Sequence, residues 1–369
     1  MKIIIATPLY PPEPGGPATY SKLLEEHLPG RGIEVALVKF DDVRRLPTGL
    51  RHLAYFLRVR RAARGADLIY ALDPVSVGLP ALFAARMSRK PLIVKVVGDY
   101  AWEQGRQRFG VTATLDEFVR QRRISPFLWG YRFVQTLVAR AALGVVVPSH
   151  YLEQIVAEWG VARTDIHVIW NAIRLEERGV VPQEVLYIKR PMIVSVGRLV
   201  PWKGFFELIQ ALQIVRENKL EASLVIVGEG PDGRVLREEA ERRLGGSWEF
   251  TGKLSHPDTL AVMRQADIFV LDSLYEGLSH TLIEALTLGK SVVVSNIGGN
   301  IEIVGHEKNG LVVPPENPQL LAEALARLIT DADLRSRLSA AALASSTDFS
   351  VEKMVQKTAD YLKAEMLVK

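Results

Sequence analysis

The chain has 369 residues and a mass of 41.0 kDa, a length that predicts about two domains. Its 48% hydrophobic and 24% charged residues are typical of a packed globular protein and exclude the disordered and low-complexity classes. Because there is no cysteine, disulfide frameworks, cysteine–zinc sites and thiol catalysis are excluded as well.

The formal net charge of +4 is unevenly divided along the chain. Residues 1–170 contain 23 Lys and Arg against 15 Asp and Glu, a net charge of +8, whereas the remaining residues are net −4. This asymmetry predicts two domains with different partners, the basic one suited to something anionic. Uncharged stretches reach only 12 residues, too few for a membrane span. The short apolar start suits a buried strand better than a signal peptide, so we expect a cytoplasmic protein.

Short apolar runs alternate with helical patterns along the first half. Six runs predict strands, at Lys2–Ala6, Val35–Phe40, Leu68–Leu72, Leu92–Val97, Gly144–Val147 and Ile166–Ile169. Helical spacing is present at Pro17–Leu28 and Leu50–Arg64. Most of the runs are continuously apolar, which is typical of parallel strands covered on both faces.

The second half repeats this alternation. Its predicted strands are Met192–Val196, Leu224–Val227, Trp248–Phe250, Ile268–Leu271, Ser291–Val294 and Gly310–Val313, and helical patterns cover Phe205–Arg216, Gly233–Leu244 and Pro318–Thr330. The sequence therefore predicts an α/β protein with two doubly wound, Rossmann-like domains over residues 1–175 and 176–350, followed by a helix over residues 351–369. Because ligands bind beyond the carboxyl ends of parallel strands, we expect the two domains to enclose a cleft.

In each half of the chain, a loop that contains glycine follows the first predicted strand. Gly15 and Gly16, before Pro17, would open the N–H groups of a helix start to an anion, although a plain turn explains them equally well. In the second half, Arg198 and Lys203 lie in a Gly-bounded loop, where a guanidinium and an ammonium can share a diphosphate. The alternative is two solvated surface cations.

The segment Gly228–Gly233 formally matches G-x-G-x-x-G between a strand and a helix, with Glu249 about 20 residues on. It is the basis for an alternative function, a nicotinamide-dependent oxidoreductase. However, Pro231 removes one N–H from such a phosphate loop, and the segment follows the second strand of its domain. A tight turn that flanks a nucleotide is the milder interpretation.

Two carboxylates, Glu276 and Glu284, straddle a loop and the first turns of a helix that starts near Ser279. That helix start would direct N–H groups at a phosphate or at sugar hydroxyls, and Glu284 could bind a ribose diol unless it is a surface glutamate. We predict no metal site, because the seven histidines lack ligand spacing and Asp331–Asp333 precedes a helix as a cap would.

Together these motifs resemble glycosyltransferase family 4, whose members have the GT-B fold, retain anomeric configuration and need no metal. The matching pieces follow family order along nearly the whole chain: Gly15-Gly16, Gly197-Arg198-Leu199, Lys203-Gly204, Gly228-Glu229-Gly230-Pro231, Phe250-Thr251-Gly252, Glu276 with Glu284, Gly298-Gly299, Glu302-Ile303-Val304 and Asn309-Gly310-Leu311-Val312. The resemblance implies a sugar transferase whose donor is a UDP-, GDP- or ADP-linked sugar and which uses no cofactor.

The resemblance also implies a role for each residue. Arg198 and Lys203 would bind the donor diphosphate, Glu276 the donor sugar and Glu284 the ribose. The other donor-binding residues would be Gly15, Gly16, Gly230, Thr251, Gly252, Lys253, Leu254, Gly277, Leu278, Ser279, His280 and Thr281, with the Phe250–Leu254 segment against the base and Gly16 near the distal phosphate when the domains close. The tail helix would cross back onto the N-terminal domain.

Three positions depart from the family pattern. Asp99 lies in the Gly98–Glu103 loop, where many members carry a histidine next to the reacting sugar, and it is the candidate for that catalytic place. The usual Asn-Gly-Val-Asp turn reads Asn171-Ala172-Ile173-Arg174. Asn300 precedes Ile301-Glu302, at or next to a position where the family often has proline.

We expect the acceptor on the basic N-terminal half. Residues 50–64 and 106–132 mix arginines with leucines and aromatic residues, a composition that suits an anionic membrane surface carrying a lipid-linked acceptor or glycan, with peripheral contact at the inner face of the plasma membrane. The alternative is that the apolar groups pack on the sheet while the arginines are solvated. Nucleic acid is not expected as a partner, because no recognition motif accompanies the charge. A non-catalytic protein that binds sugar nucleotides is a third possible function.

Overall fold

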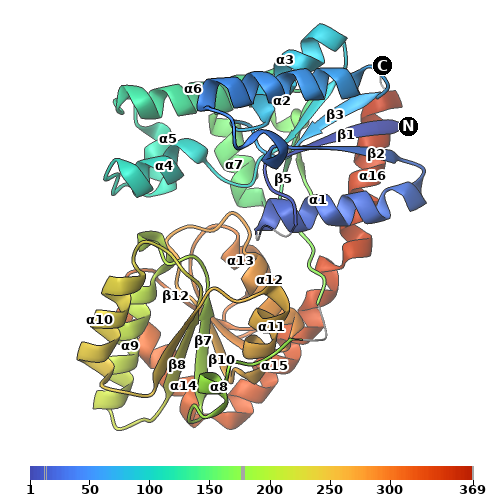
Figure 1. Cartoon of the computed structure of the whole chain (residues 1–369). Helices are drawn as coiled ribbons and strands as arrows, with labels where there is room; N and C mark the ends of the chain where they lie inside the picture. The colour runs from blue at the N-terminus through green and yellow to red at the C-terminus, as the bar shows by residue number, and fades with distance from the viewer. Residues whose placement is uncertain (12, 14, 176–178, 368–369) are drawn as a thin grey trace. The chain divides into compact units, whose positions relative to one another are not determined.

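The computed structural model of the chain describes residues 1–11, 13, 15–175 and 179–367. It divides into two compact units (Figure 1): unit 1 comprises Met1–Ala172 with Val351–Lys369, and unit 2 comprises Ile173–Ser350. Residue 176, at which the sequence predicts the second domain to begin, lies outside the described residues.

Unit 1 is built on a six-stranded parallel sheet in the order β2-β1-β3-β4-β5-β6. Its strands are β1 (Lys2–Thr7), β2 (Glu34–Lys39), β3 (Leu68–Ala71), β4 (Leu92–Lys95), β5 (Gly144–Val147) and β6 (Ile166–Val168). Its α-helices are α1 (Gly16–His27), α2 (Thr48–Ala63), α3 (Gly78–Ser88), α4 (Tyr100–Arg108), α5 (Leu115–Arg120), α6 (Pro126–Ala141), α7 (His150–Glu158) and α16 (Val351–Leu367).

Unit 2 contains a second six-stranded parallel sheet, in the order β12-β11-β10-β7-β8-β9. Its strands are β7 (Met192–Val196), β8 (Ser223–Val227), β9 (Trp248–Gly252), β10 (Ile268–Leu271), β11 (Ser291–Ser295) and β12 (Leu311–Val313). Its α-helices are α8 (Gln183–Leu186), α9 (Phe205–Glu217), α10 (Gly233–Leu244), α11 (His256–Gln265), α12 (His280–Thr287), α13 (Asn300–Ile303), α14 (Pro318–Thr330) and α15 (Ala332–Ser345).

All twelve predicted strands are present in the described part of the chain, and the predicted fold of two Rossmann-like parallel sheets is confirmed. The central strands β3, β4, β7, β8 and β10 are buried at every residue, because helices cover both faces of each sheet. The predicted run Leu92–Val97 is longer than β4, which ends at Lys95; Val97 is already exposed in the loop that follows.

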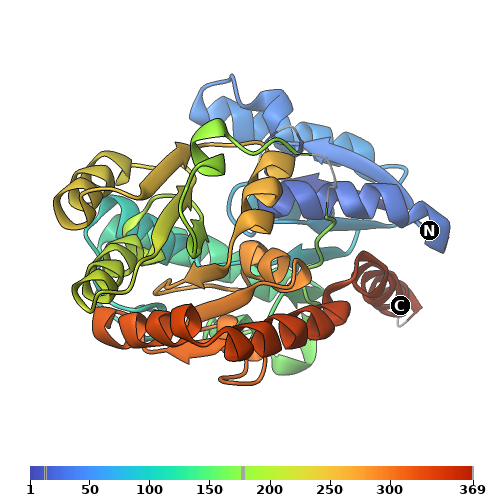
Figure 2. The same ribbon diagram turned by 90° about the horizontal axis from the view of Figure 1, so that it is seen from below.

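The C-terminal helix returns to unit 1, as the resemblance implies. α16 lies beside α1 in both views (Figure 1 and Figure 2) and buries Met354, Val355 and Leu362 in the core of this unit. The hydroxyl groups of Thr358 and Tyr20 lie 3.4 Å apart, and Glu365 lies 3.8 Å from His167. Among the described residues, no helix combines the length and apolar character needed to cross a bilayer.

Candidate active site

The predicted donor-binding residues of unit 2 gather at the carboxyl edge of its sheet. They lie at the end of β9, in the loops after β7, β8, β9 and β10, and in the first turns of α12. They comprise Arg198, Lys203, Gly230, Thr251, Gly252, Lys253, Leu254, Glu276, Gly277, Leu278, Ser279, His280, Thr281 and Glu284. In a doubly wound sheet this edge is where ligands bind.

An ion pair joins two of these loops. Lys203 Nζ lies 2.5 Å from Glu276 Oε1, and the Ser273 hydroxyl donates to the same carboxylate oxygen at 2.8 Å. The side chains of Lys203 and Glu276 are 18% and 11% exposed. The backbone N–H of Leu274 donates to Trp202 O at 2.8 Å, which ties the loop after β10 to the 3-10 turn Pro201–Lys203. Ser273 therefore holds the Glu276 carboxylate, and the backbone hydrogen bond holds the two loops together.

The glycines around this pair are required by close backbone approaches. Gly204 has a φ of 69°, and a Cβ there would lie 1.9 Å from the carbonyl oxygen of Asp272. A Cβ on Gly299 would lie 2.2 Å from Gly277 O, and the Gly299 N–H donates to Glu276 O at 3.0 Å. These contacts explain two of the glycine motifs as conditions for bringing the loops after β7, β10 and β11 together.

The G-x-G-x-x-G segment has the same explanation. Gly228 has a φ of 140°, and a Cβ there would lie 1.9 Å from Gly197 O. A Cβ on Gly230 would lie 2.2 Å from Leu199 O, and Leu199 N–H donates to Glu229 O at 3.0 Å. Packing of the loops after β7 and β8 thus accounts for these glycines without a dinucleotide.

Glu284 is buried rather than on a solvated helix face. Its side chain is 7% exposed, and its Oε1 lies 2.8 Å from His256 Nε2 at the start of α11. Sequence reasoning did not identify His256. The only available signal was its position, two residues beyond the Phe250–Leu254 segment assigned to the base.

The start of α12 matches the prediction. Ser279 caps the helix by accepting a hydrogen bond from the backbone N–H of Leu282 at 3.3 Å, and its hydroxyl lies 3.0 Å from that of Thr281. The first N–H groups of a helix have no partner within the helix and carry partial positive charge. Beside Lys203 and Glu276, this start can receive an anionic or hydroxyl-rich ligand.

Asp272, at the end of β10, was also not identified from the sequence. Its side chain is buried, and neither carboxylate oxygen has a hydrogen-bond partner in the described part of the chain. Burial, helped by the negative charges of Glu207 and Glu316, raises the pKa of Asp272 to about 8. Near neutral pH this carboxyl therefore holds its proton.

Two predicted donor contacts are exposed. Arg198 lies in the loop after β7, and Lys253 after β9 forms an ion pair with Glu229 at 3.8 Å. Both members of that pair are more than half exposed, so the pair contributes little to stability.

The remaining predicted site residues belong to unit 1. Gly15, with a φ of 138°, precedes α1, and its carbonyl accepts hydrogen bonds from the N–H groups of Ala18 and Thr19 at 3.0 and 3.1 Å; Gly16 is the first residue of that helix. The loop after β1 thus ends on a helix start, as the glycine pair indicated.

Asp99 also lies in unit 1, where it caps α4. It is 1% exposed, and its two carboxylate oxygens accept hydrogen bonds at 2.8 Å from Trp102 N–H and from Gln135 Nε2. Burial raises its pKa, while these hydrogen bonds oppose the shift. Each oxygen thus accepts one hydrogen bond inside the unit, and the side chain caps α4. Its contact with the donor sugar stays a prediction.

No group of three or more acidic or histidine side chains that could hold a metal ion occurs in residues 1–11, 13, 15–175 and 179–367. Asp331 caps α15 by accepting a hydrogen bond from Leu334 N–H at 2.8 Å, which confirms the predicted cap.

Two protein-family models match the chain in succession. The model described as "Glycosyl transferase 4-like domain" matches residues 4–172, and the model described as "Glycosyl transferases group 1" matches residues 181–344. The chain belongs to glycosyltransferase family 4. The resemblance read from the sequence motifs is therefore confirmed.

Curated relatives of this family-4 chain include two proteins of Mycobacterium tuberculosis. The GDP-mannose-dependent alpha-(1-6)-phosphatidylinositol monomannoside mannosyltransferase is 33% identical over 186 residues, which cover 48% of each chain. Glycogen synthase is 29% identical over 312 residues, which cover 81% of this chain and 69% of the synthase. The chain spans about half the length of the mannosyltransferase that it matches.

Solved structures share the fold. HepE of Anabaena in complex with UDP-glucose matches with a TM-score of 0.76 at 21% identity, over 99% of this chain and 100% of that chain. Sucrose-phosphate synthase from Thermosynechococcus elongatus matches with a TM-score of 0.79 at 19% identity, over the whole of both chains. These matches establish that the family-4 chain has the GT-B fold.

Proposed function

We propose that this chain transfers a sugar from a nucleoside diphosphate sugar to an acceptor, with retention of anomeric configuration and without a metal. The observation that carries the proposal is the Lys203–Glu276 pair, supported by Ser273 beside the capped start of α12. Family membership favours transfer over a nicotinamide-dependent reaction.

Cleavage of the bond between sugar and diphosphate places growing negative charge on the leaving group. Lys203 and Arg198 in the loop after β7, together with the first N–H groups of α12, would stabilise this charge. The Lys203 ammonium is held 2.5 Å from Glu276 before any donor arrives. A bound diphosphate would share this ammonium, while Glu276 would turn an oxygen toward the hydroxyls of the donor sugar.

Glu284 suits the ribose. A buried carboxylate is costly unless it is hydrogen-bonded, and the 2.8 Å contact with His256 supplies one partner. Two ribose hydroxyls could donate to the remaining acceptor positions of the carboxylate. The Phe250–Leu254 segment would then lie against the base.

Two relatives suggest which donors to test first. HepE was solved with UDP-glucose, and the mannosyltransferase is named for GDP-mannose. The acceptor would bind on unit 1, where residues 50–64 and 106–132 mix arginines with leucines and aromatic residues, and its chemistry would be anionic, as a lipid-linked sugar or a glycan.

The test combines binding and turnover. We expect one class among UDP-, GDP- and ADP-sugars to raise the melting temperature of the full chain and to release nucleoside diphosphate in the presence of a metal chelator. Lys203→Ala should lower kcat/KM by about a hundredfold to a thousandfold, by analogy with the loss of one transition-state donor. The matched control is Arg242→Ala, which removes an exposed cation paired with Glu239 on α10 and should leave turnover unchanged.

Equal turnover of Lys203→Ala and Arg242→Ala would overturn the proposed site. Loss of turnover on chelation would overturn the metal-free part of the proposal. Donor binding with no transfer to any acceptor would instead support a non-catalytic sugar-nucleotide-binding protein.

A further inference from the structure

Three neighbouring helices of unit 1, α2, α3 and α6, contain no Asp or Glu. α3 packs against both α2 and α6, so the three helices form one layer (Figure 1). Every other α-helix described in unit 1 carries at least one acidic residue. The three helices contain seven arginines, which are Arg51, Arg58, Arg60, Arg61, Arg86, Arg132 and Arg140. We call the outer surface of these helices the acid-free face.

The acid-free face also exposes large apolar side chains. Eight of them are at least half exposed, namely Leu50, Leu53, Leu57, Phe83, Met87, Phe127, Trp129 and Phe133. The rings of Trp129 and Phe133 stack with centroids 5.4 Å apart, and Phe127 stacks on Phe109 at 6.0 Å. A single exposed leucine is ordinary on a soluble protein, but eight such groups on adjacent helices indicate an interaction surface.

The apolar and basic groups are partly separated along the helices. Because the strands are parallel, α2, α3 and α6 all run from the carboxyl edge of the sheet toward its amino edge. Leu50 and Leu53 lie near the start of α2 and Arg60 and Arg61 near its end. α6 likewise begins with aromatic residues and has Arg140 in its last turn. Most of the exposed apolar groups thus lie toward the carboxyl edge and most of the arginines toward the amino edge; Met87, at the end of α3, and Arg51, near the start of α2, are the exceptions.

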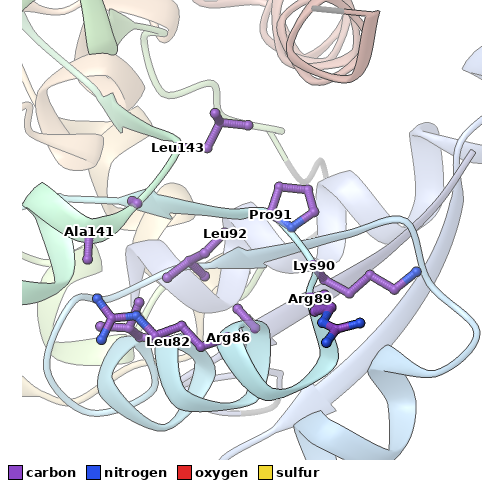
Figure 3. Close-up of a pocket in the computed structure, with 10 residues that line it drawn as sticks. Leu82, Arg86, Arg89, Lys90, Pro91, Leu92, Ala141 and Leu143 are labelled. Carbon is purple, nitrogen blue, oxygen red and sulfur yellow. The ribbon is translucent and has the colours of Figure 1, made fainter. Parts of the chain in front are cut away.

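A pocket of about 260 Å³ lies at the basic end, between the end of α3 and the turn from α6 into β5. Figure 3 shows three cations among its lining residues, Arg86, Arg89 and Lys90. No acidic residue lines it, and the described part of the chain offers none of the three cations an ion-pair partner. Arg61 and Arg64, at the end of α2, also lack an acidic partner among the described residues. The cations at this end are therefore available to an external anion.

We infer that the acid-free face docks on a bilayer of anionic phospholipids. The exposed leucines and stacked aromatic rings would enter the headgroup and upper acyl region, as in interfacial amphipathic helices. Arg61 and Arg64 would contact lipid phosphates, and the pocket at Arg86, Arg89 and Lys90 would receive one of them. Arg58 and Arg132 are already engaged, by Asp42 and by the backbone carbonyls of Phe118 and Gln121.

Charge and chemistry select this occupant. A second copy presenting the same face would bring cations against cations, which disfavours a symmetric dimer. A nucleic acid would use the cations but has no need of eight exposed apolar groups. Docking on the bilayer does not depend on turnover. Only the further step, that docking brings the enzyme to a lipid-linked acceptor, rests on the proposed function.

The experiment is co-sedimentation of the full chain with vesicles of phosphatidylcholine alone or with about one-third phosphatidylglycerol. The face variant combines Arg61→Gln, Arg64→Gln and Arg86→Gln. The matched control combines Lys22→Gln, Lys353→Gln and Lys363→Gln, which remove the same charge from α1 and α16. A second variant, Leu53→Ser with Trp129→Ser, tests the apolar contribution.

We expect the wild type and the control to bind the anionic vesicles and to bind more weakly as salt rises. The face variant should bind roughly a hundredfold more weakly, at about fivefold per cation lost, and the apolar variant should also bind more weakly. Circular dichroism and the melting temperature verify that each variant is folded. Equal binding by face variant and control, equal binding to neutral vesicles, or no vesicle binding by the wild type would each overturn the inference.

Donor-induced stabilisation, measured on the same samples without vesicles, separates the two proposals. If it is present in the face variant while vesicle binding is lost, docking is supported independently of catalysis. If donors never bind but the acid-free face still directs vesicle binding, the proposed function fails and the docking inference stands.

Discussion

Lys95 is a buried base with no hydrogen-bond partner among the described residues. It ends β4, is 2% exposed, and its Nζ lies 3.8 Å from the centroid of the Tyr20 ring. The ring face attracts a cation, but burial lowers the pKa of Lys95 from 10.5 to about 7, because a low-dielectric surrounding favours the neutral amine. The folded protein therefore binds this proton more weakly than the unfolded chain does.

This difference predicts how stability depends on pH. Between about pH 7 and pH 9 the unfolded chain holds the Lys95 proton and the folded protein releases it, so the contribution of Lys95 to the free energy of unfolding should rise with pH. In Lys95→Met this contribution is absent. The free energy of unfolding of the wild type minus that of the variant should therefore grow by about 2 kcal/mol across that range, as measured by chemical denaturation.

The control for this measurement is Lys22→Met, which removes a half-exposed lysine from α1. Its difference from the wild type should stay constant with pH. A constant difference for Lys95→Met as well would show that Lys95 keeps its proton in the folded protein.

The sequence allowed individual candidate residues to be predicted, but not the contacts between them. Lys203, Glu276 and Glu284 could each be identified from motif spacing, because a loop after a strand is a local feature. Their partners could not, since Ser273 and His256 depend on how β9, β10 and their loops pack. For Asp99 the sequence suggested a sugar contact, which stays a prediction, and only the structure shows that its buried carboxylate caps α4.

At the scale of elements, the loops after β7 and β10 meet without space for a side chain. Gly204 lies where the Pro201–Lys203 turn leads into α9, with its Cα against the carbonyl of Asp272. Gly245, which ends α10, has a similar positive φ, 65° against 69°, with a ψ of −27° against 20°, but open space around it. A substitution at Gly245 therefore tests backbone strain alone, whereas one at Gly204 tests strain together with a steric clash.

We predict that Gly245→Ala costs about 1 kcal/mol of stability, the usual penalty of a left-handed conformation for a residue with a Cβ. Gly204→Ala should cost at least about 2 kcal/mol more and should also reduce turnover, because the displaced turn carries Lys203. Denaturation and nucleoside diphosphate release measure the two effects. Equal costs at the two positions would mean that the loops can separate freely.

At the scale of the whole molecule, unit 1 is built from two segments that are far apart in sequence. α16 follows unit 2 in sequence but packs into the core of unit 1, where Leu362 is fully buried. The α-helix that precedes it in sequence, α15, belongs to unit 2. Unit 1 is therefore completed only by residues from the far end of the chain.

Leu362→Ala should consequently destabilise unit 1 and leave unit 2 protected. The expected loss is about 2–5 kcal/mol, the range for removing a buried leucine side chain. Hydrogen exchange followed by mass spectrometry reads the two units separately: peptides from residues 1–172 should exchange faster, and those from 173–350 should not. The matched variant Leu325→Ala, fully buried on α14 in unit 2, should reverse the pattern. Faster exchange throughout the chain in both variants would contradict independent units.

The sequence by itself determined the twelve strands, the two parallel sheets and the family, because continuous apolar runs, helical spacing and loop motifs are properties of neighbouring residues. It also revealed the excess of basic residues in the first half. Only the tertiary structure brought Lys203 to Glu276 and His256 to Glu284, and gave Asp99 its place as a cap. It likewise assembled the acid-free face from α2, α3 and α6, whose segments are separated in sequence by strands. These contacts depend on which elements the crossovers place side by side, and that depends on packing between distant segments of the chain.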